Sequence, residues 1–257
     1  MRVLFIADVV GKPGRRGLVA AMPELRERHR PDIVIANAEN SAGGIGVTKK
    51  SAGELLDAGA DVLTTGNHVY RHSEVYEYLD RTDRVIRPAN YPHANPGVGH
   101  TVVETAGRRV GVVNLSGGVG LTVSRNPFHE IDAILARIEA DVVIVDFHAE
   151  VTSEKVAMGW HLDGQVAAVL GTHTHVPTAD ARVLPRGTAY ISDVGMTGSR
   201  TSVLGVKPEQ ALKSFTTQMP VKFETAEDDV WVMGAVVDVN DTGLADSIEA
   251  VVVPAQP

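Results

Sequence analysis

Short, mostly apolar runs recur through the first two thirds of the chain and alternate with amphipathic stretches. The runs cover residues 3–7, 33–36, 61–65, 141–146 and 166–170. Apolar runs of this length are typical of strands buried on both faces. Between the first two runs, Leu18, Met22 and Leu25 recur at the spacing of a one-faced helix. The alternation of strand and helix predicts an α/β fold with a parallel or mixed sheet.

Local signals predict the other helices and the loops. Thr48 suits the N-cap of a helix that runs through Leu55 and Leu56, and Asn126 followed by Pro127 suits the start of another. Further helices are predicted over residues 73–79, 153–160 and 208–215, and residues 8–14 and 193–198 are predicted to be loops.

Two hairpins are predicted about short turns, and two more strands close the chain. The hairpins pair residues 101–104 with 109–114 and residues 181–184 with 188–191, and the last strands cover residues 230–239 and 248–253. These later hairpins predict a second, more antiparallel sheet. No repeat or polar linker divides the sequence, so we expect one domain over residues 1–257.

Composition excludes several classes of protein. The chain has a net charge of −8, which argues against a surface for long nucleic acids, since these are gripped by clustered Lys and Arg. A small phosphorylated substrate remains open because metal ions can neutralise it locally. The chain has no cysteine, so metal ligands must be His, carboxylate or amide side chains. The apolar run after Met1 is too short for a signal peptide or a membrane span, and we expect a cytoplasmic protein without a membrane partner.

Side chains that bind metals follow five of the predicted strands. They are Asp8, Glu39, Asn67, His148, and the pair His173 and His175. Ligands of open α/β sheets bind beyond the carboxyl ends of the strands, so these side chains are expected at one sheet edge. If the segment after residue 170 is extended, the side chains of His173 and His175 point the same way.

Taken singly, each of these residues has a simpler interpretation. Asp8 could cap a helix, Asn67 could hold a turn, and His148 could be a packed histidine. Taken together, five strand ends with this chemistry predict a metal site. Carboxylates, amides and imidazoles without thiolates suit Mn, Fe or Zn, and six ligands are natural for two neighbouring ions.

The order of these motifs resembles that of the calcineurin-like metallophosphoesterases, and most closely their YmdB-like branch. The resemblance covers essentially the whole chain and rests on DVVGKPGR (8–15), NAEN (37–40), TGNH (65–68), RPANY (87–91), GTHTH (171–175) and DVGMTG (193–198). The chain has Val10 where most of the wider superfamily has a ligand histidine, and Glu39 followed by Asn40 where most have a bridging aspartate. The YmdB-like branch shares both changes.

The resemblance implies a four-layer α/β/β/α sandwich of two mixed sheets and a site with two divalent or trivalent ions, Fe or Mn before Zn. It implies one ion bound by Asp8, Glu39, Asn40 and His175, and a second bound by Glu39, Asn67, His148 and His173. A hydroxide between the ions would attack the phosphorus atom, and His68 would protonate the leaving oxygen. Asp146 or Glu150 is a candidate to orient the ring of His148.

The resemblance further implies a metal-dependent phosphodiesterase acting on small, 2′,3′-cyclic nucleotides. Three alternatives stay open on the sequence alone. The chain could be a general phosphatase that prefers phosphomonoesters, a metal-dependent regulatory protein with incidental activity, or a protein with a structural metal. Neither the native metal, the base preference nor the existence of a homo-oligomer follows from the motifs.

Overall fold

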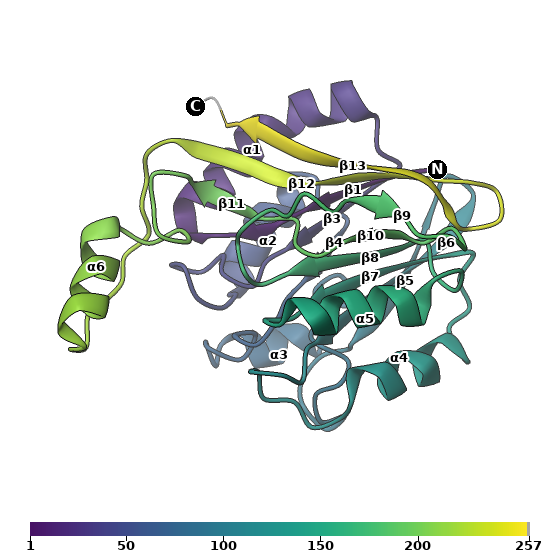
Figure 1. The fold of residues 1–257 in the computed structure, drawn as a ribbon, viewed down its shortest axis with the longest axis horizontal. Coiled ribbons are helices and arrows are strands. Elements are labelled where there is room, and N and C mark those ends of the chain that lie inside the picture. Colours follow the sequence, from purple (N-terminus) through teal and green to yellow (C-terminus); the bar gives the residue numbers. More distant parts are fainter. Residues whose placement is uncertain (256–257) are drawn as a thin grey trace.

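The computed structural model of the protein describes residues 1–255 and contains two stacked sheets flanked by helices (Figure 1). The first sheet combines strands from both ends of the chain. Its order is β2 (Asp8–Val9), β11 (Met196–Ser199), β12 (Val230–Val239), β1 (Arg2–Ile6), β3 (Ile33–Asn37) and β4 (Val62–Thr64), and β13 (Ala245–Pro254) also pairs with β12.

The second sheet is built from the middle of the chain. Its order is β5 (His100–Thr105), β6 (Arg108–Ser116), β7 (Val142–His148), β8 (Ala168–Thr172), β10 (Ala189–Ile191) and β9 (Arg182–Val183). β6, β7, β8 and β10 are parallel, and the two predicted hairpins add the antiparallel strands β5 and β9 at its edges. The prediction of a separate, more antiparallel second sheet is therefore wrong, because the last hairpin, β12–β13, joins the first sheet beside β1.

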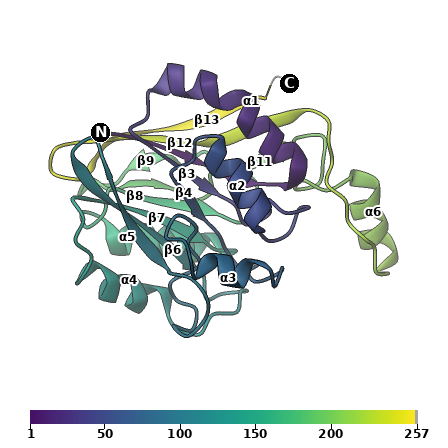
Figure 2. The ribbon, with the colours of Figure 1, turned by 180° about the vertical axis from the view of Figure 1, so that it is seen from behind.

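Helices cover the outer face of each sheet, and this confirms the predicted four-layer α/β/β/α sandwich. α1 (Gly11–His29) and α2 (Lys49–Asp57) lie on the first sheet, and α4 (Pro127–Leu135) and α5 (Thr152–Leu162) lie on the second (Figures 1 and 2). The short α3 (Val75–Leu79) packs with the first group through its buried Val75 and Leu79. α6 (Pro208–Thr217) stands apart from both sheets (Figure 1).

The burial of β1 explains why its sequence is apolar at every position after Arg2. Val3 and Phe5 point into the core between the sheets, whereas Leu4 and Ile6 point toward the helices on the outer face. Alternate side chains of a strand point to opposite faces, so a strand in the middle of a four-layer sandwich needs apolar residues throughout. The same arrangement fixes where each strand ends and hence where the polar side chains that follow it lie.

The predicted helix caps are present, but one predicted loop is helical. The Thr48 side chain accepts a hydrogen bond from the backbone of Ser51, and Asn126 caps α4. Residues 8–14 were expected to be a loop because of their glycine and proline content. Instead α1 begins at Gly11, and Pro13 lies in its first turn, where a missing N–H costs nothing.

Two sequence predictions are not tested by this architecture. Across residues 1–255, no helix is long and apolar enough to cross a membrane. The cytoplasmic location stays a prediction, as does the single-domain organisation.

Candidate metal centre

The predicted ligands meet where strands of both sheets end, not at the edge of one sheet. Asp8 begins β2, and Glu39 and Asn67 follow β3 and β4 of the first sheet. His148 ends β7, and His173 directly follows β8, both in the second sheet. The prediction of a shared edge was thus right about the strand ends but wrong about the number of sheets. The centre lies where the two layers face each other.

His148 contacts candidate ligands from both sheets. Its Nε2 atom lies 3.0 Å from Nδ1 of His173 and 3.1 Å from Oδ1 of Asn67. The same Nε2 atom lies 3.8 Å from Oε1 of Glu39. The structure therefore brings together the four side chains that the resemblance assigns to one ion.

Asp8 and Glu39 each keep one carboxylate oxygen without a hydrogen-bond partner. Both side chains are fully buried. One oxygen of Asp8 accepts from the backbone N of His173 at 3.2 Å, and one oxygen of Glu39 accepts from the backbone N of His68. Oδ1 of Asp8 and Oε2 of Glu39 are buried and unpaired. Since a buried, unpaired carboxylate oxygen is costly, these two atoms suit a cation.

His175 and Asn40 approach Asp8 from the other side. Nε2 of His175 lies 3.7 Å from Oδ1 of Asp8 and 2.9 Å from Nδ2 of Asn40. Oδ1 of Asn40 faces the ring of His68 at 3.3 Å instead. Asn40 is thus in reach of the centre, but its amide must turn for its oxygen to act as a ligand.

Each of the three predicted ligand histidines has its second ring nitrogen beside an acceptor outside the centre. Nδ1 of His148 lies 2.9 Å from Oγ1 of Thr172, whose own O–H donates to Asp146 at 2.7 Å. Nε2 of His173 lies 2.9 Å from Oε2 of Glu150, and Nδ1 of His175 lies 3.0 Å from the carbonyl oxygen of Leu204. Such partners fix the tautomer of a metal-binding histidine.

These outer contacts leave lone pairs pointing into the centre. In the neutral rings, Nε2 of His148 and Nδ1 of His173 carry no hydrogen and face each other at 3.0 Å. Two facing lone pairs need a shared proton or a cation between them. Within residues 1–255, no three His, Asp or Glu side chains are placed ready to hold an ion without adjustment. The unpaired oxygens and the oriented nitrogens nevertheless form a donor set that fits hard and borderline metal ions.

The segment that carries His173 and His175 is not extended as predicted. Both residues have positive φ angles, 100° for His173 and 64° for His175. Residues other than glycine rarely adopt this conformation, and each instance costs about 1–3 kcal/mol. Because of the turn, His173 points toward His148 while His175 points toward Asp8, so the two rings do not lie side by side.

Two glycines make room for the centre. A Cβ atom on Gly66 would lie 2.2 Å from Cδ2 of His148, and one on Gly171 would lie 1.8 Å from the backbone oxygen of Ser192. Gly66 thus lets the ring of His148 reach Asn67, which follows it in the chain. Gly171 lets β8 approach the segment after β10. The glycines of both motifs therefore have a packing reason.

His68 lies at the mouth of the centre. Its side chain is 35% exposed, and its Nδ1 atom lies 3.3 Å from both Oε1 of Glu39 and Oδ1 of Asn40. Burial lowers the pKa of His68 below its ordinary value. A half-exposed imidazole beside the buried ligands is accessible to a substrate that the ligands themselves are not.

Burial dominates the electrostatics of the inner groups. It raises the pKa of Glu39 well above its usual range, raises that of Asp146 to about 7, and lowers that of His148 well below the value of free histidine. Burial also acts to raise the pKa of Asp8, but the neighbouring His175 and His148 outweigh it and lower that pKa. A proton on His175 and a cation beside Asp8 satisfy the same negative charge.

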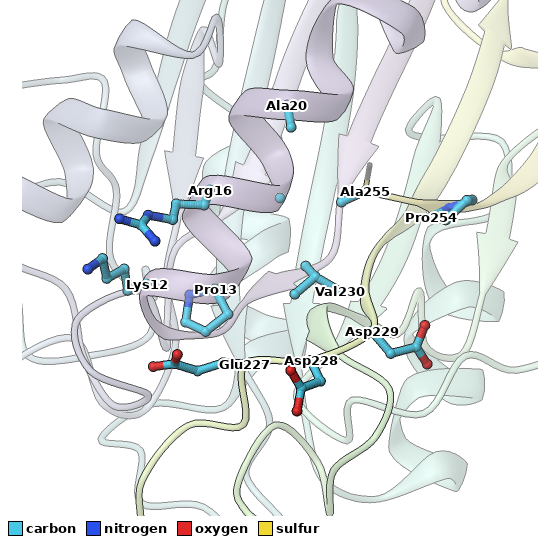
Figure 3. Close-up of a pocket in the computed structure, with 11 residues that line it drawn as sticks. Lys12, Pro13, Arg16, Ala20, Glu227, Asp228, Asp229, Val230, Pro254 and Ala255 are labelled. Atoms are coloured by element: carbon cyan, nitrogen blue, oxygen red, sulfur yellow. The ribbon is translucent and has the colours of Figure 1, made fainter. Parts of the chain in front are cut away.

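A hollow elsewhere on the surface does not contain these residues. It has a volume of about 500 Å³ and lies beside α1, where Lys12 and Arg16 face Glu227, Asp228 and Asp229 (Figure 3). Its lining includes Pro13, Ala20 and Val230, and none of the candidate ligands lines it. Pocket size alone would therefore have indicated the wrong part of the molecule.

Sequence reasoning missed the residues that orient the ligands. It offered Asp146 or Glu150 for His148, whereas Asp146 acts through Thr172 and Glu150 contacts His173. Thr172 lies inside the GTHTH motif, so its polarity within a buried strand was a usable signal. The carbonyl of Leu204 had no signal in the sequence, since any residue offers one.

Comparisons with known proteins agree with this geometry. A sequence model of the family described as "YmdB-like protein" matches residues 4–251. A Bacillus subtilis (strain 168) protein named 2′,3′-cyclic-nucleotide 2′-phosphodiesterase is 44% identical over 256 residues, which cover 98% of this chain and 97% of the relative. Similar crystal structures are those of a hypothetical protein from Thermus thermophilus, with a TM-score of 0.95, 41% identity and full coverage of both chains, and of a novel phosphatase from Mycoplasma pneumoniae, with a TM-score of 0.93 and 35% identity over 100% of this chain and 95% of the other.

Proposed function

The chain belongs to the YmdB-like protein family, and on that premise we propose that it is a metal-dependent phosphodiesterase that hydrolyses 2′,3′-cyclic nucleotides. The observation that carries the proposal is the set of oriented donors around Glu39. Three histidines turn their free nitrogens toward two buried carboxylates whose outer oxygens have no partner in the protein. Such a set serves cations, and phosphate esters are substrates that cations assist.

We propose that two ions share these residues as the resemblance implies. Asp8, Glu39, Asn40 and His175 would hold one ion, and Glu39, Asn67, His148 and His173 would hold the other. Glu39 lies between the two groups, since it approaches His148 at 3.8 Å and the mouth residue His68 at 3.3 Å. When bound, the ions would lower the pKa of a water molecule toward neutrality and neutralise the phosphoryl group. Fe or Mn suits the oxygen and nitrogen donors, and Zn is compatible with them.

The protein's own residues have separate tasks in this proposal. The outer acceptors Thr172, Glu150 and the Leu204 carbonyl hold the three rings in the tautomer that leaves a free nitrogen inside. His68 is the proposed proton donor to the leaving oxygen, because its ring stands at the mouth and is partly open to solvent. Neither task requires the backbone of the centre to move.

A preference for phosphomonoesters is the second candidate. It is favoured by the similarity to the Mycoplasma pneumoniae structure, which is described as a phosphatase. The residues of the centre contact the phosphate and not the rest of a substrate, so both classes fit them. A regulatory role with incidental activity makes a different prediction, because it would survive the loss of Glu39.

The test is a substrate panel with the Mn-loaded protein. We expect turnover of 2′,3′-cyclic nucleotides to nucleoside monophosphates at a higher kcat/KM than that of phosphomonoesters. Glu39→Gln, which keeps the size of the side chain, should abolish both turnover and metal binding. No turnover of any cyclic nucleotide by the wild-type protein would overturn the proposal, and faster turnover of monoesters would favour the second candidate.

A further inference from the structure

A buried ion pair lies behind the loop that carries His173 and His175. Nζ of Lys155 lies 2.6 Å from Oδ2 of Asp193, and the two residues are only 2% and 1% exposed. Lys155 comes from α5, and Asp193 follows β10. Well-packed apolar residues often stabilise a core as much as a buried ion pair does. A pair at this place therefore invites a search for a second role.

The carboxylate of Asp193 also binds the histidine loop directly. Its Oδ2 atom accepts hydrogen bonds from N and Oγ1 of Thr174, at 3.1 Å and 2.8 Å. Further along the loop, N of Thr178 donates to the backbone oxygen of Asp193 at 3.0 Å. Asp193 thus holds the loop at two points, and the first of them is the residue between the two predicted ligands.

The backbone on both sides of Thr174 needs such support. His173 and His175 have φ angles of 100° and 64°, which side-chain-bearing residues rarely adopt without contacts that impose them. The backbone N of His173 is bound to Asp8, and the ring of His175 to the Leu204 carbonyl. Thr174 has its own anchor in Asp193, whose charge is balanced by Lys155.

We infer that Asp193, paired with Lys155, positions His173 and His175 for metal binding by holding Thr174 between them. The inference rests on the metal centre proposed above. Asp193 is a positioning residue and not a ligand, because its carboxylate oxygens are directed to Lys155, Thr174 and the backbone N of Gly195. A purely structural role would affect the stability of the fold but not the affinity of a folded centre for metal.

The first test removes one hydroxyl. In Thr174→Val the branched shape and the backbone N–H remain, but the hydrogen bond from Oγ1 to Asp193 is lost. Mn²⁺ binding to metal-free, full-length protein is followed by the electron paramagnetic resonance signal of free Mn²⁺, without substrate. We expect affinity to fall about 10-fold or more, the effect typical of losing a partner that orients ligands. Thr174→Ser, which keeps the hydroxyl, should restore affinity to within about twofold.

The matched control is Thr188→Val. Thr188 is fully buried, and its Oγ1 atom donates to the carbonyl oxygens of Leu162 and Val166 away from the centre. This substitution should lower the melting temperature of the metal-free protein and leave Mn²⁺ affinity unchanged. It separates a loss of stability from a loss of positioning.

The second test removes the ion pair as a whole. The double variant Lys155→Met/Asp193→Asn leaves no unpaired buried charge, so it should fold, and we expect it to bind Mn²⁺ at least as weakly as Thr174→Val. Affinities of both variants within twofold of wild type would overturn the inference, and Thr174→Val decides alone if the double variant does not fold. Because no substrate is present, a wild-type protein that binds Mn²⁺ but hydrolyses no cyclic nucleotide would contradict the proposed function and not this inference.

Discussion

The hydroxyl of Thr172 stands 2.9 Å from Nδ1 of His148 while its own proton is donated to Asp146. Because the O–H is committed to the carboxylate, the oxygen can only accept from the ring of His148. Asp146 is held in turn by donors from Thr64 and Asn37 of the first sheet. One chain of hydrogen bonds therefore crosses between the sheets and sets the free nitrogen of His148 toward the centre.

Breaking this chain should weaken metal binding. In Thr172→Val the ring of His148 loses its acceptor, and we expect metal affinity to fall about 10- to 100-fold. Isothermal titration of metal-free protein with Mn²⁺ measures the change. Thr172→Ser keeps the hydroxyl and should bind nearly as the wild type does, and equal weakening in both variants would show that the methyl group matters and not the hydrogen bond.

Gly66 should not tolerate a side chain. The Cβ atom of Gly66→Ala would lie 2.2 Å from His148, so either the ring or the TGNH loop must shift. We expect a loss of stability of about 1–3 kcal/mol from overpacking, together with a larger loss of metal-dependent activity. Urea unfolding and kcat measure the two effects. Gly53→Ala, whose Cβ would meet no atom within 4 Å, is the control and should be almost neutral in activity.

His68 should affect turnover more than binding. If it protonates the leaving oxygen, His68→Asn should lower kcat about 10²- to 10⁴-fold with little change in Mn²⁺ affinity. Steady-state kinetics with a 2′,3′-cyclic nucleotide, beside metal titration, provide both values. The role of proton donor would be refuted by a loss of metal affinity as large as the loss of kcat, since that would make His68 a residue that only orients Glu39 or Asn40.

Asp180 should make the fold more sensitive to acid. Burial acts to raise its pKa, but hydrogen bonds from Ser192 and Thr178 outweigh burial and lower it. A lowered folded pKa contributes stability that is present above the unfolded value of about 3.9 and is lost as pH falls through the folded pKa. We therefore expect Asp180→Asn to destabilise the protein at pH 7 and to differ less from wild type at about pH 3. A difference in urea midpoint that stays constant between these pH values would contradict this account.

The identities of the ligands could be predicted from sequence because strand ends are visible in a single chain. Apolar runs locate the buried strands, and the polar residue after each run is placed by the geometry of parallel sheets. The partition of strands between the sheets could not be predicted in this way. β1 pairs with β12, more than two hundred residues later, and the local pattern of β12 does not indicate which neighbour it takes.

The directions of the ligand side chains were also beyond the sequence. An extended conformation after residue 170 was the default for a strand continuing into a loop, but His173 and His175 turn through positive φ angles instead. Contacts distant in sequence impose this turn, among them those of His175 with Leu204 and of Thr174 with Asp193. Such contacts exist only once the two sheets are stacked.

Anomalous diffraction from crystals of the Mn-loaded protein tests the central claim most directly. The account predicts two manganese peaks with Glu39 between them, one beside Asp8 and His175 and the other beside His148 and His173. His173 and His175 would then serve different ions, in agreement with the separate directions of their rings. A single peak bound by both His173 and His175 would contradict the account.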